Sequence, residues 1–221
     1  MTDRPAINSE QLKRRILSLS ALVEENARRC VIAIRQRDRE AAERVIASDK
    51  DVDRLEIAIE EDCVHLLMLG GLPKEEIRLI VAILKINSDL ERIGDLSANI
   101  ARRVLNIGEH DQLVLPNELM ILAERTMTMV RLSLDSLVGM DAAGARDVCA
   151  ADSEVDALHR EMHDLVRNRI QENPEQTERL LNVLAISRHL ERIADYATNI
   201  AENVVYVQEE KIIRHHHRAE R

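Results

Sequence analysis

The chain has 221 residues, of which 45% are hydrophobic and 32% are charged, with only six Gly, four Pro, no Trp and no Phe. Apolar material made of Leu, Ile, Val, Ala and Met, with few breakers, favours long helices and argues against a sheet protein. The net charge of −9, with no clustered basic face, argues against binding of nucleic acid through phosphates.

Three cysteines, Cys30, Cys63 and Cys149, show no C-x-x-C spacing, which favours reduced core cysteines of a cytosolic protein. The N-terminal segment lacks an apolar signal region, and no run approaches the length of a membrane span. We therefore expect a cytoplasmic protein without membrane insertion, peripheral to the inner face of the membrane only through its partners.

The first half of the chain predicts three helices. Ser9 opens a helix whose apolar residues follow a 3.6-residue stripe to a polar turn at 35–38. A second helix covers about 39–69 and ends at Gly70-Gly71. A third begins at Pro73 and continues to about residue 107.

The second half repeats this plan after a connection that begins at Gly108. Pro116-Asn117 opens a fourth helix, which Gly139 closes, and Asp141 opens a fifth. Asn173-Pro174 predicts an N-cap followed by Pro at the first position of a sixth helix.

Two sequence segments occur twice and reveal the repeat directly. ASDKDVDRL from Ala47 aligns with AADSEVDAL from Ala150, and LERIGDLSANIA from Leu90 aligns with LERIADYATNIA from Leu190. Two copies of a three-helix unit follow. Long helices joined by short turns pack antiparallel, so each unit should be a rod about 45 Å long, with the two rods side by side.

The predicted fold is thus all-α, with two tandem three-helix bundles. We assign residues 1–110 to the first repeat, 111–212 to the second, and 213–221 to a disordered charged tail that contains three histidines. Broad apolar faces leave association into a homodimer open.

Each repeat carries two acidic pairs with i, i+4 spacing beside an apolar stripe. Such like charges destabilise an isolated helix by roughly 0.2–0.5 kcal/mol per pair, so some compensation is expected. Facing helices lie about 8–10 Å apart, close enough for two pairs to share a hard cation such as Mg, Mn or Fe. The candidate metal ligands are Asp49 and Asp53, Glu91 and Asp95, Asp152 and Asp156, and Glu191 and Asp195.

Alternatively, arginines neutralise these pairs at helix interfaces, and Arg54, Arg92, Arg192 and neighbouring arginines are the candidates. The fifth helix adds His159 and His163 on the face of its acidic pair, where the second helix has Glu56 and Glu60. Two His at i, i+4 can chelate a transition metal, although the spacing also arises by chance on a surface.

At these residues the sequence resembles the PhoU family, over nearly the whole chain. The residues that carry the resemblance are the duplicated LERI-(G/A)-D followed by N-I-A, and the acidic segment about forty residues before each copy. The resemblance implies two three-helix bundles related by pseudo-two-fold symmetry. It also implies a negative regulator of the phosphate-starvation response and modulator of phosphate uptake.

In this family such a regulator links the ATPase subunit of the phosphate ABC transporter to a sensor histidine kinase. The resemblance further implies metal clusters, with iron or zinc, at the four acidic pairs, and Asn99 and Asn199 as supporting residues one turn beyond each Asp. Together with the carboxylate chemistry, the candidate ions are Fe, Zn, Mn and Mg.

Two other functions stay open from the residues alone. A carboxylate-bridged metalloenzyme would use Glu-x-x-His-like motifs, which Asp62-x-x-His65 and Asp156-x-x-His159 approximate. A purely structural scaffold would only pair the carboxylates with arginine. The interpretation as a regulator without catalysis is favoured, because the chain has neither a P-loop nor a G-x-S-x-G motif.

Overall fold

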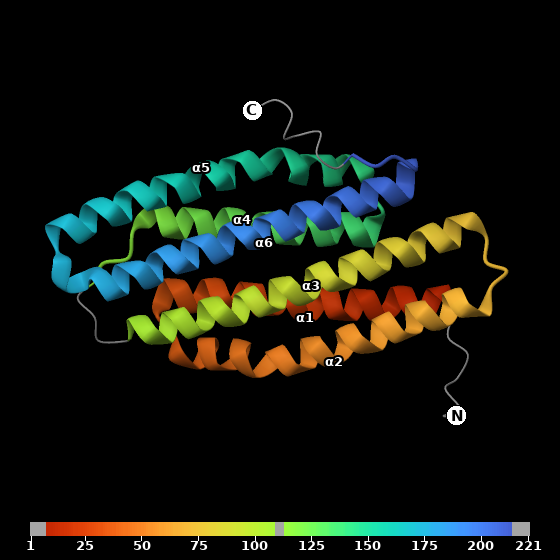
Figure 1. Cartoon of the computed structure of the whole chain (residues 1–221), viewed down its shortest axis with the longest axis horizontal. Coiled ribbons are helices and arrows are strands. Elements are labelled where there is room, and N and C mark those ends of the chain that lie inside the picture. The colour runs from red at the N-terminus through yellow and green to blue at the C-terminus, as the bar shows by residue number, and fades with distance from the viewer. Residues whose placement is uncertain (1–7, 109–112, 214–221) are drawn as a thin grey trace.

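A computed structural model describes residues 8–108 and 113–213, and within these ranges the chain is all-α and contains no strand (Figure 1). The predicted all-α class with two tandem three-helix units is confirmed. The helices are α1 (Ser9–Gln36), α2 (Arg39–Leu69), α3 (Lys74–Ile107), α4 (Asn117–Gly139), α5 (Ala142–Glu172) and α6 (Thr177–Glu209).

The start of the sixth helix differs from its prediction. Pro174–Gln176 forms a single 3-10 turn, α6 begins at Thr177, and Asn173 makes no side-chain cap. The Thr177 hydroxyl donates instead to the Pro174 carbonyl at 2.6 Å. Short 3-10 turns commonly precede an α-helix, and Pro fits their first position. The predicted disordered tail lies outside the described residues, apart from Ile213, which packs partly against the core.

The turn between the first two helices of each repeat has the same structure, a left-handed residue followed by an Asp that caps the next helix. Arg37 and Met140 adopt left-handed conformations, with φ of 51° and 50°, directly after α1 and α4. The next residues, Asp38 and Asp141, cap α2 and α5 by accepting a backbone N–H of the first turn at 2.9 and 3.0 Å. Helix capping by Asp thereby sets where α2 and α5 begin.

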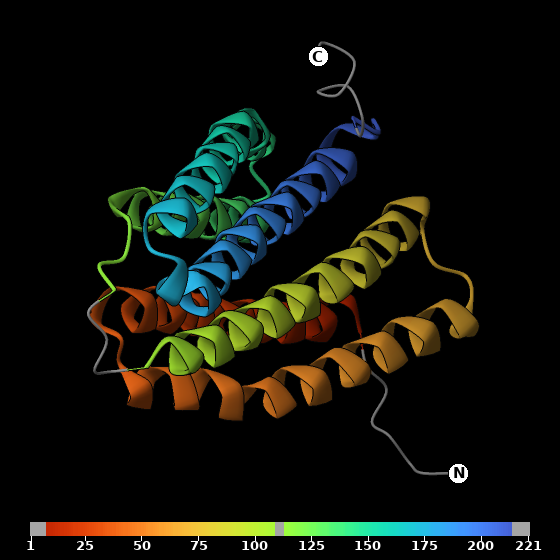
Figure 2. The same ribbon diagram turned by 60° about the vertical axis from the view of Figure 1, so that its left-hand side comes forward.

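α3 and α6 lie antiparallel along each other where the two repeats meet, and α1 and α4 also contact each other across this interface (Figures 1 and 2). The apolar core is continuous across both repeats. Polar contacts follow the α3–α6 seam in antiparallel order: Lys85 with Tyr206, Asp89 with Asn199, Arg92 with Tyr196, and Arg103 with Asn182.

The three cysteines are buried free thiols, as predicted. Burial raises the pKa of Cys63 and Cys149 to about 12, which keeps both thiols protonated and unreactive. None of the helices in the two described ranges has a segment long and apolar enough to cross a membrane.

Asp62 of α2 is 4% exposed and forms an ion pair with Arg15 of α1. This contact directs Asp62 toward α1, while His65 is exposed. In the Asp62-x-x-His65 motif of the metalloenzyme alternative, Asp62 therefore forms a structural ion pair with Arg15 and does not share a site with His65. The aligned position of the second repeat is Leu165, so the repeat does not require a charge there.

We expect Arg15→Ala to lower the free energy of unfolding by about 2 kcal/mol, because the buried Asp62 carboxylate loses its partner. Asp62→Leu, which introduces the residue of the second repeat, should leave stability unchanged or raise it, since the desolvated charge disappears. Urea unfolding at pH 7 measures both. A loss in Asp62→Leu as large as that in Arg15→Ala would contradict this account.

Candidate functional site

Carboxylates of α2 and α3 converge in the first repeat. One oxygen each of Asp49, Asp53 and Asp95 lies within 4.8 Å of the others, so the three could hold one ion. Within 8–108 and 113–213, no other group of three His, Cys or acidic residues brings its ligand atoms this close. The structure thus joins three of the predicted ligands, from both motifs of the first repeat, on facing helices.

A close approach of the two helices positions these carboxylates. A Cβ atom added to Gly94 would lie 3.1 Å from Cγ1 of Val52, tighter than ordinary packing. Gly94 directly precedes Asp95, and Val52 directly precedes Asp53. The absent side chain at Gly94 therefore lets α2 and α3 come together where the acidic pairs stand.

Mutual repulsion is visible in the electrostatics of this cluster. The pKa of Glu91 lies above its usual value because of burial first, then the charges of Asp95 and Glu56. Burial likewise raises the pKa of Asp49, with smaller contributions from Asp95 and Asp53. Both effects disfavour the ionised form, and a cation among the carboxylates would relieve both.

Glu56 also belongs to this cluster, although it was not among the ligands predicted from the sequence. Its pKa is raised by burial, then by Glu60 and Asp53. Asn87 of α3 donates to the Glu56 side chain at 3.2 Å and to its backbone carbonyl at 2.9 Å. The sequence places Glu56 on the same face of α2 as Asp49 and Asp53. Its contact with α3, however, depends on how the two helices pack.

Arginine neutralises the cluster only in part. Arg102 approaches Asp49 Oδ2 at 3.4 Å and donates to Asn99 at 2.9 Å, so Asn99 acts by holding Arg102. Asp49 Oδ1 is buried without a hydrogen-bond partner. Such an orphaned, desolvated oxygen is costly, and it fits a ligand position for a cation.

The three arginines that the alternative invoked hydrogen-bond elsewhere. Arg54 donates to Asp51, outside the acidic pairs, at 2.6 Å. Arg92 and Arg192 each approach the hydroxyl of Tyr196 at 3.3 Å. This arrangement places them at the seam between α3 and α6.

In the second repeat the predicted ligands lie near one another, but no three of these described residues bring their ligand atoms within 4.8 Å. Burial raises the pKa of Glu191, followed by the charges of Asp156 and Asp152, which places Glu191 of α6 beside the α5 pair. Thr198 donates to Asp152 Oδ1 at 3.4 Å. Asp195 is half-buried on α6, the helix that faces this pair.

His159 extends this second cluster toward nitrogen ligands. Its Nδ1 lies 2.7 Å from the Ser187 hydroxyl, and its ring meets that of His163 edge-on, with centroids 5.0 Å apart. Burial lowers the pKa of His159, followed by the charges of His163 and Arg188, which favours the neutral, metal-competent ring. Asn199 instead reaches across to Asp89 of α3.

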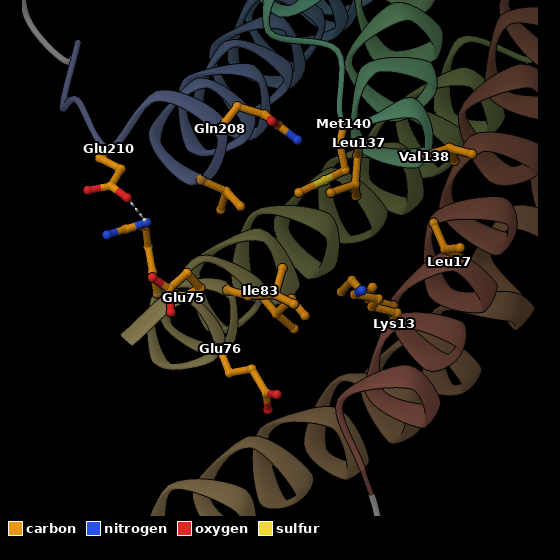
Figure 3. Close-up of a pocket in the computed structure, with 14 residues that line it drawn as sticks. Lys13, Leu17, Glu75, Glu76, Ile83, Leu137, Val138, Met140, Gln208 and Glu210 are labelled. Carbon is orange, nitrogen blue, oxygen red and sulfur yellow. Dashed lines mark hydrogen bonds and ion pairs between the residues drawn. The ribbon is translucent and has the colours of Figure 1, made fainter. Parts of the chain in front are cut away.

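A separate pocket of about 570 Å³ opens between the repeats, lined by α1, α3, α4 and α6 (Figure 3). Its walls include Leu17, Ile83, Leu137 and Met140. Charged groups on its rim are already paired, as in the 2.9 Å contact of Arg78 with Glu210. None of the acidic-pair residues lines it. This pocket is not predictable from the sequence, because segments from both repeats form it.

Fold and site together define a duplicated helical-bundle protein in which acidic pairs from facing helices of each repeat lie near one another. The PhoU domain matches this chain twice, at residues 16–104 and 119–204, and the chain therefore belongs to the PhoU family.

Relatives and solved structures agree over most of the length. The chain is 32% identical over 208 residues to the "Phosphate-specific transport system accessory protein PhoU homolog" of Aquifex aeolicus, covering 94% of each protein. The crystal structure of PhoU from Pseudomonas aeruginosa matches with a TM-score of 0.88 and 31% identity, over 91% of this chain and 97% of that one. The regulatory protein PhoU from Streptococcus pneumoniae matches with a TM-score of 0.81 and 30% identity, over 92% and 96%.

Glu91→Gln should stabilise the metal-free protein at pH 7 by about 0.5 kcal/mol, because a like charge disappears. A raised folded-state pKa means that wild-type stability falls as pH rises through the carboxyl range. The advantage of Glu91→Gln should thus be absent near pH 4 and complete at pH 7. Unfolding in EDTA at both pH values tests this, with the exposed Glu161→Gln as control. An equal effect at both pH values would refute the repulsion.

Proposed function

We propose that this protein is a negative regulator of the phosphate-starvation response and a modulator of phosphate uptake. In this proposal it acts as an adaptor between the ATPase subunit of the phosphate ABC transporter and a sensor histidine kinase. The observation that carries the proposal is the similarity, over both repeats, to proteins named phosphate-specific transport system accessory proteins. The crystal structure from Streptococcus pneumoniae is likewise that of a phosphate transport system regulatory protein.

The proposal includes a cation site in the first repeat, held by Asp49, Asp53 and Asp95 with Glu91 beside them. Three ligand oxygens within 4.8 Å and the orphaned Asp49 Oδ1 support it. All these donors are carboxylates, which suit Mg, Mn or Fe. A bound ion would offset the repulsion between α2 and α3 and stiffen that helix pair.

The second repeat would hold its ion with Asp152, Asp156, Glu191 and Asp195, and with His159 and His163 as added nitrogen donors. Imidazole shifts preference toward Zn or Fe, so the two repeats would differ in the metal they favour. In both sites the chain's own groups bind and orient the ion. The regulator needs no catalytic step from it.

Addition of Mn²⁺ at about 100 times its dissociation constant should stabilise the folded protein by roughly 2.7 kcal/mol for each occupied site. For a chain of this length, the expected rise in Tm is roughly 5–10 °C per occupied site. Asp53→Asn/Asp95→Asn should lose the contribution of the first site, which is about half of the total shift if both sites fill with Mn²⁺ and all of it if only the first does. Differential scanning calorimetry measures it.

Asp135→Asn, on α4 outside both clusters, is the matched control and should keep the full shift. A shift of equal size in the double variant would remove the first-repeat cluster from metal binding.

Deletion of the gene should derepress a phosphate-starvation reporter, such as alkaline phosphatase, in phosphate-replete cells. Expression of the wild-type protein in these cells should restore repression. Glu91→Ala/Asp95→Ala should restore less silencing if the cluster serves signalling. Circular dichroism and cellular protein level must first show that the variant is folded and present. Unchanged reporter output on deletion would refute the regulatory function itself.

A further inference from the structure

The outer face of α2 presents large apolar side chains to solvent. Ile57, Val64 and Met68 are 55%, 45% and 81% exposed. At 100° per residue these three positions lie within about 40° of one another, on the side of α2 opposite the buried Ile59. They form one stripe, which we call the α2 outer stripe. Large exposed apolar side chains that gather on one helix face can mark an interaction site.

The second repeat provides an internal control for this stripe. With the alignment of Ala47 to Ala150, the positions of Ile57, Val64 and Met68 become Arg160, Arg167 and Gln171 in α5. The inward position of Ile59 stays apolar, as the buried Met162.

α2 and α5 occupy equivalent places in their repeats (Figure 1). Packing of the repeat therefore requires the inner residues alone, and the outer apolar residues of α2 serve something that α5 does not.

Charge around the stripe restricts what can cover it. Glu60 and Glu61 are exposed on the same helix and flank the stripe, whereas the exposed Lys50 and Arg54 lie beyond its N-terminal end, where Arg54 is paired with Asp51. A second copy of the chain docked through this face would place two acidic flanks, each with Glu60 and Glu61, against each other. Like charges at an interface disfavour such pairing. An anionic lipid surface would be repelled for the same reason.

We propose that the α2 outer stripe docks a partner protein whose contact surface is an apolar ridge flanked by Lys or Arg. The apolar side chains of α2 would supply the contact area, and the acidic flank would select the partner and its orientation. The spacing of Ile57, Val64 and Met68 is that of one helix face packed against a partner helix, whose apolar stripe is the ridge. The proposal rests on the proposed function only in that a regulator of this kind works through protein partners.

The test is photo-crosslinking in living cells, with p-benzoylphenylalanine placed at position 64 in one strain and at the aligned position 167 in another. Position 64 should yield an adduct with one other protein, and its cross-linked peptide should contain apolar residues next to Lys or Arg. Position 167 should yield at least 10-fold less of it. Ile57→Arg/Met68→Gln, which introduces the residues of α5 at exposed sites, should lower the adduct at position 64 by at least 10-fold.

Each other outcome overturns the proposal: no adduct at position 64, an adduct with a second copy or with lipid, an acidic cross-linked peptide, or equal yields at 64 and 167. The reporter assay on the deletion strain separates this from the proposed function. A silent reporter with a specific adduct at 64 would refute the phosphate regulator and leave the docking face standing. A derepressed reporter without an adduct at position 64 would support the phosphate regulator and refute the docking face.

Discussion

The antiparallel packing of α3 against α6 is the contact on which the rest of this structure depends. Each of these helices is apolar on more than one side, so it contacts the outer helices of its own repeat and its counterpart in the other. Leu90 and Leu190, the first residues of the two repeated segments, are both buried in the shared core. The repeats consequently form one hydrophobic unit. A pocket of about 570 Å³ remains where the two halves meet at one end.

Beside this core each repeat places carboxylates where they are only half solvated. Burial and mutual repulsion raise the pKa of Glu91 in the first repeat and of Glu191 in the second. The missing side chain of Gly94 allows α2 to come close, and in the second repeat Ala194 occupies that place. This difference is consistent with a tighter carboxylate cluster in the first repeat and a more open one, extended by His159, in the second.

Duplication lets the two halves share a set of buried apolar positions and differ at the others. Asp62 is paired with Arg15 in α2, where α5 has Leu165, and the outer face of α2 is apolar where that of α5 carries arginine. These changes leave the common fold intact because they lie outside the positions that are apolar and buried in both helices, such as Ile59 in α2 and Met162 in α5. Function can therefore diverge between the repeats without a cost in packing.

The sequence by itself determined the helices, most of their ends and the duplication, because few breakers interrupt the apolar periodicity and the same motifs recur about one hundred residues apart. It also placed Asp49, Asp53 and Asp95 among the candidate ligands, since their acidic pairs lie beside apolar stripes. Only the tertiary structure decided which side chains meet across helices. The entry of Glu56 into the cluster, the contact of Arg102 with Asp49, and the diversion of Arg92 to Tyr196 depend on it. Periodicity specifies the face of a helix on which a residue lies, whereas the neighbour that this face meets is set by packing between distant segments.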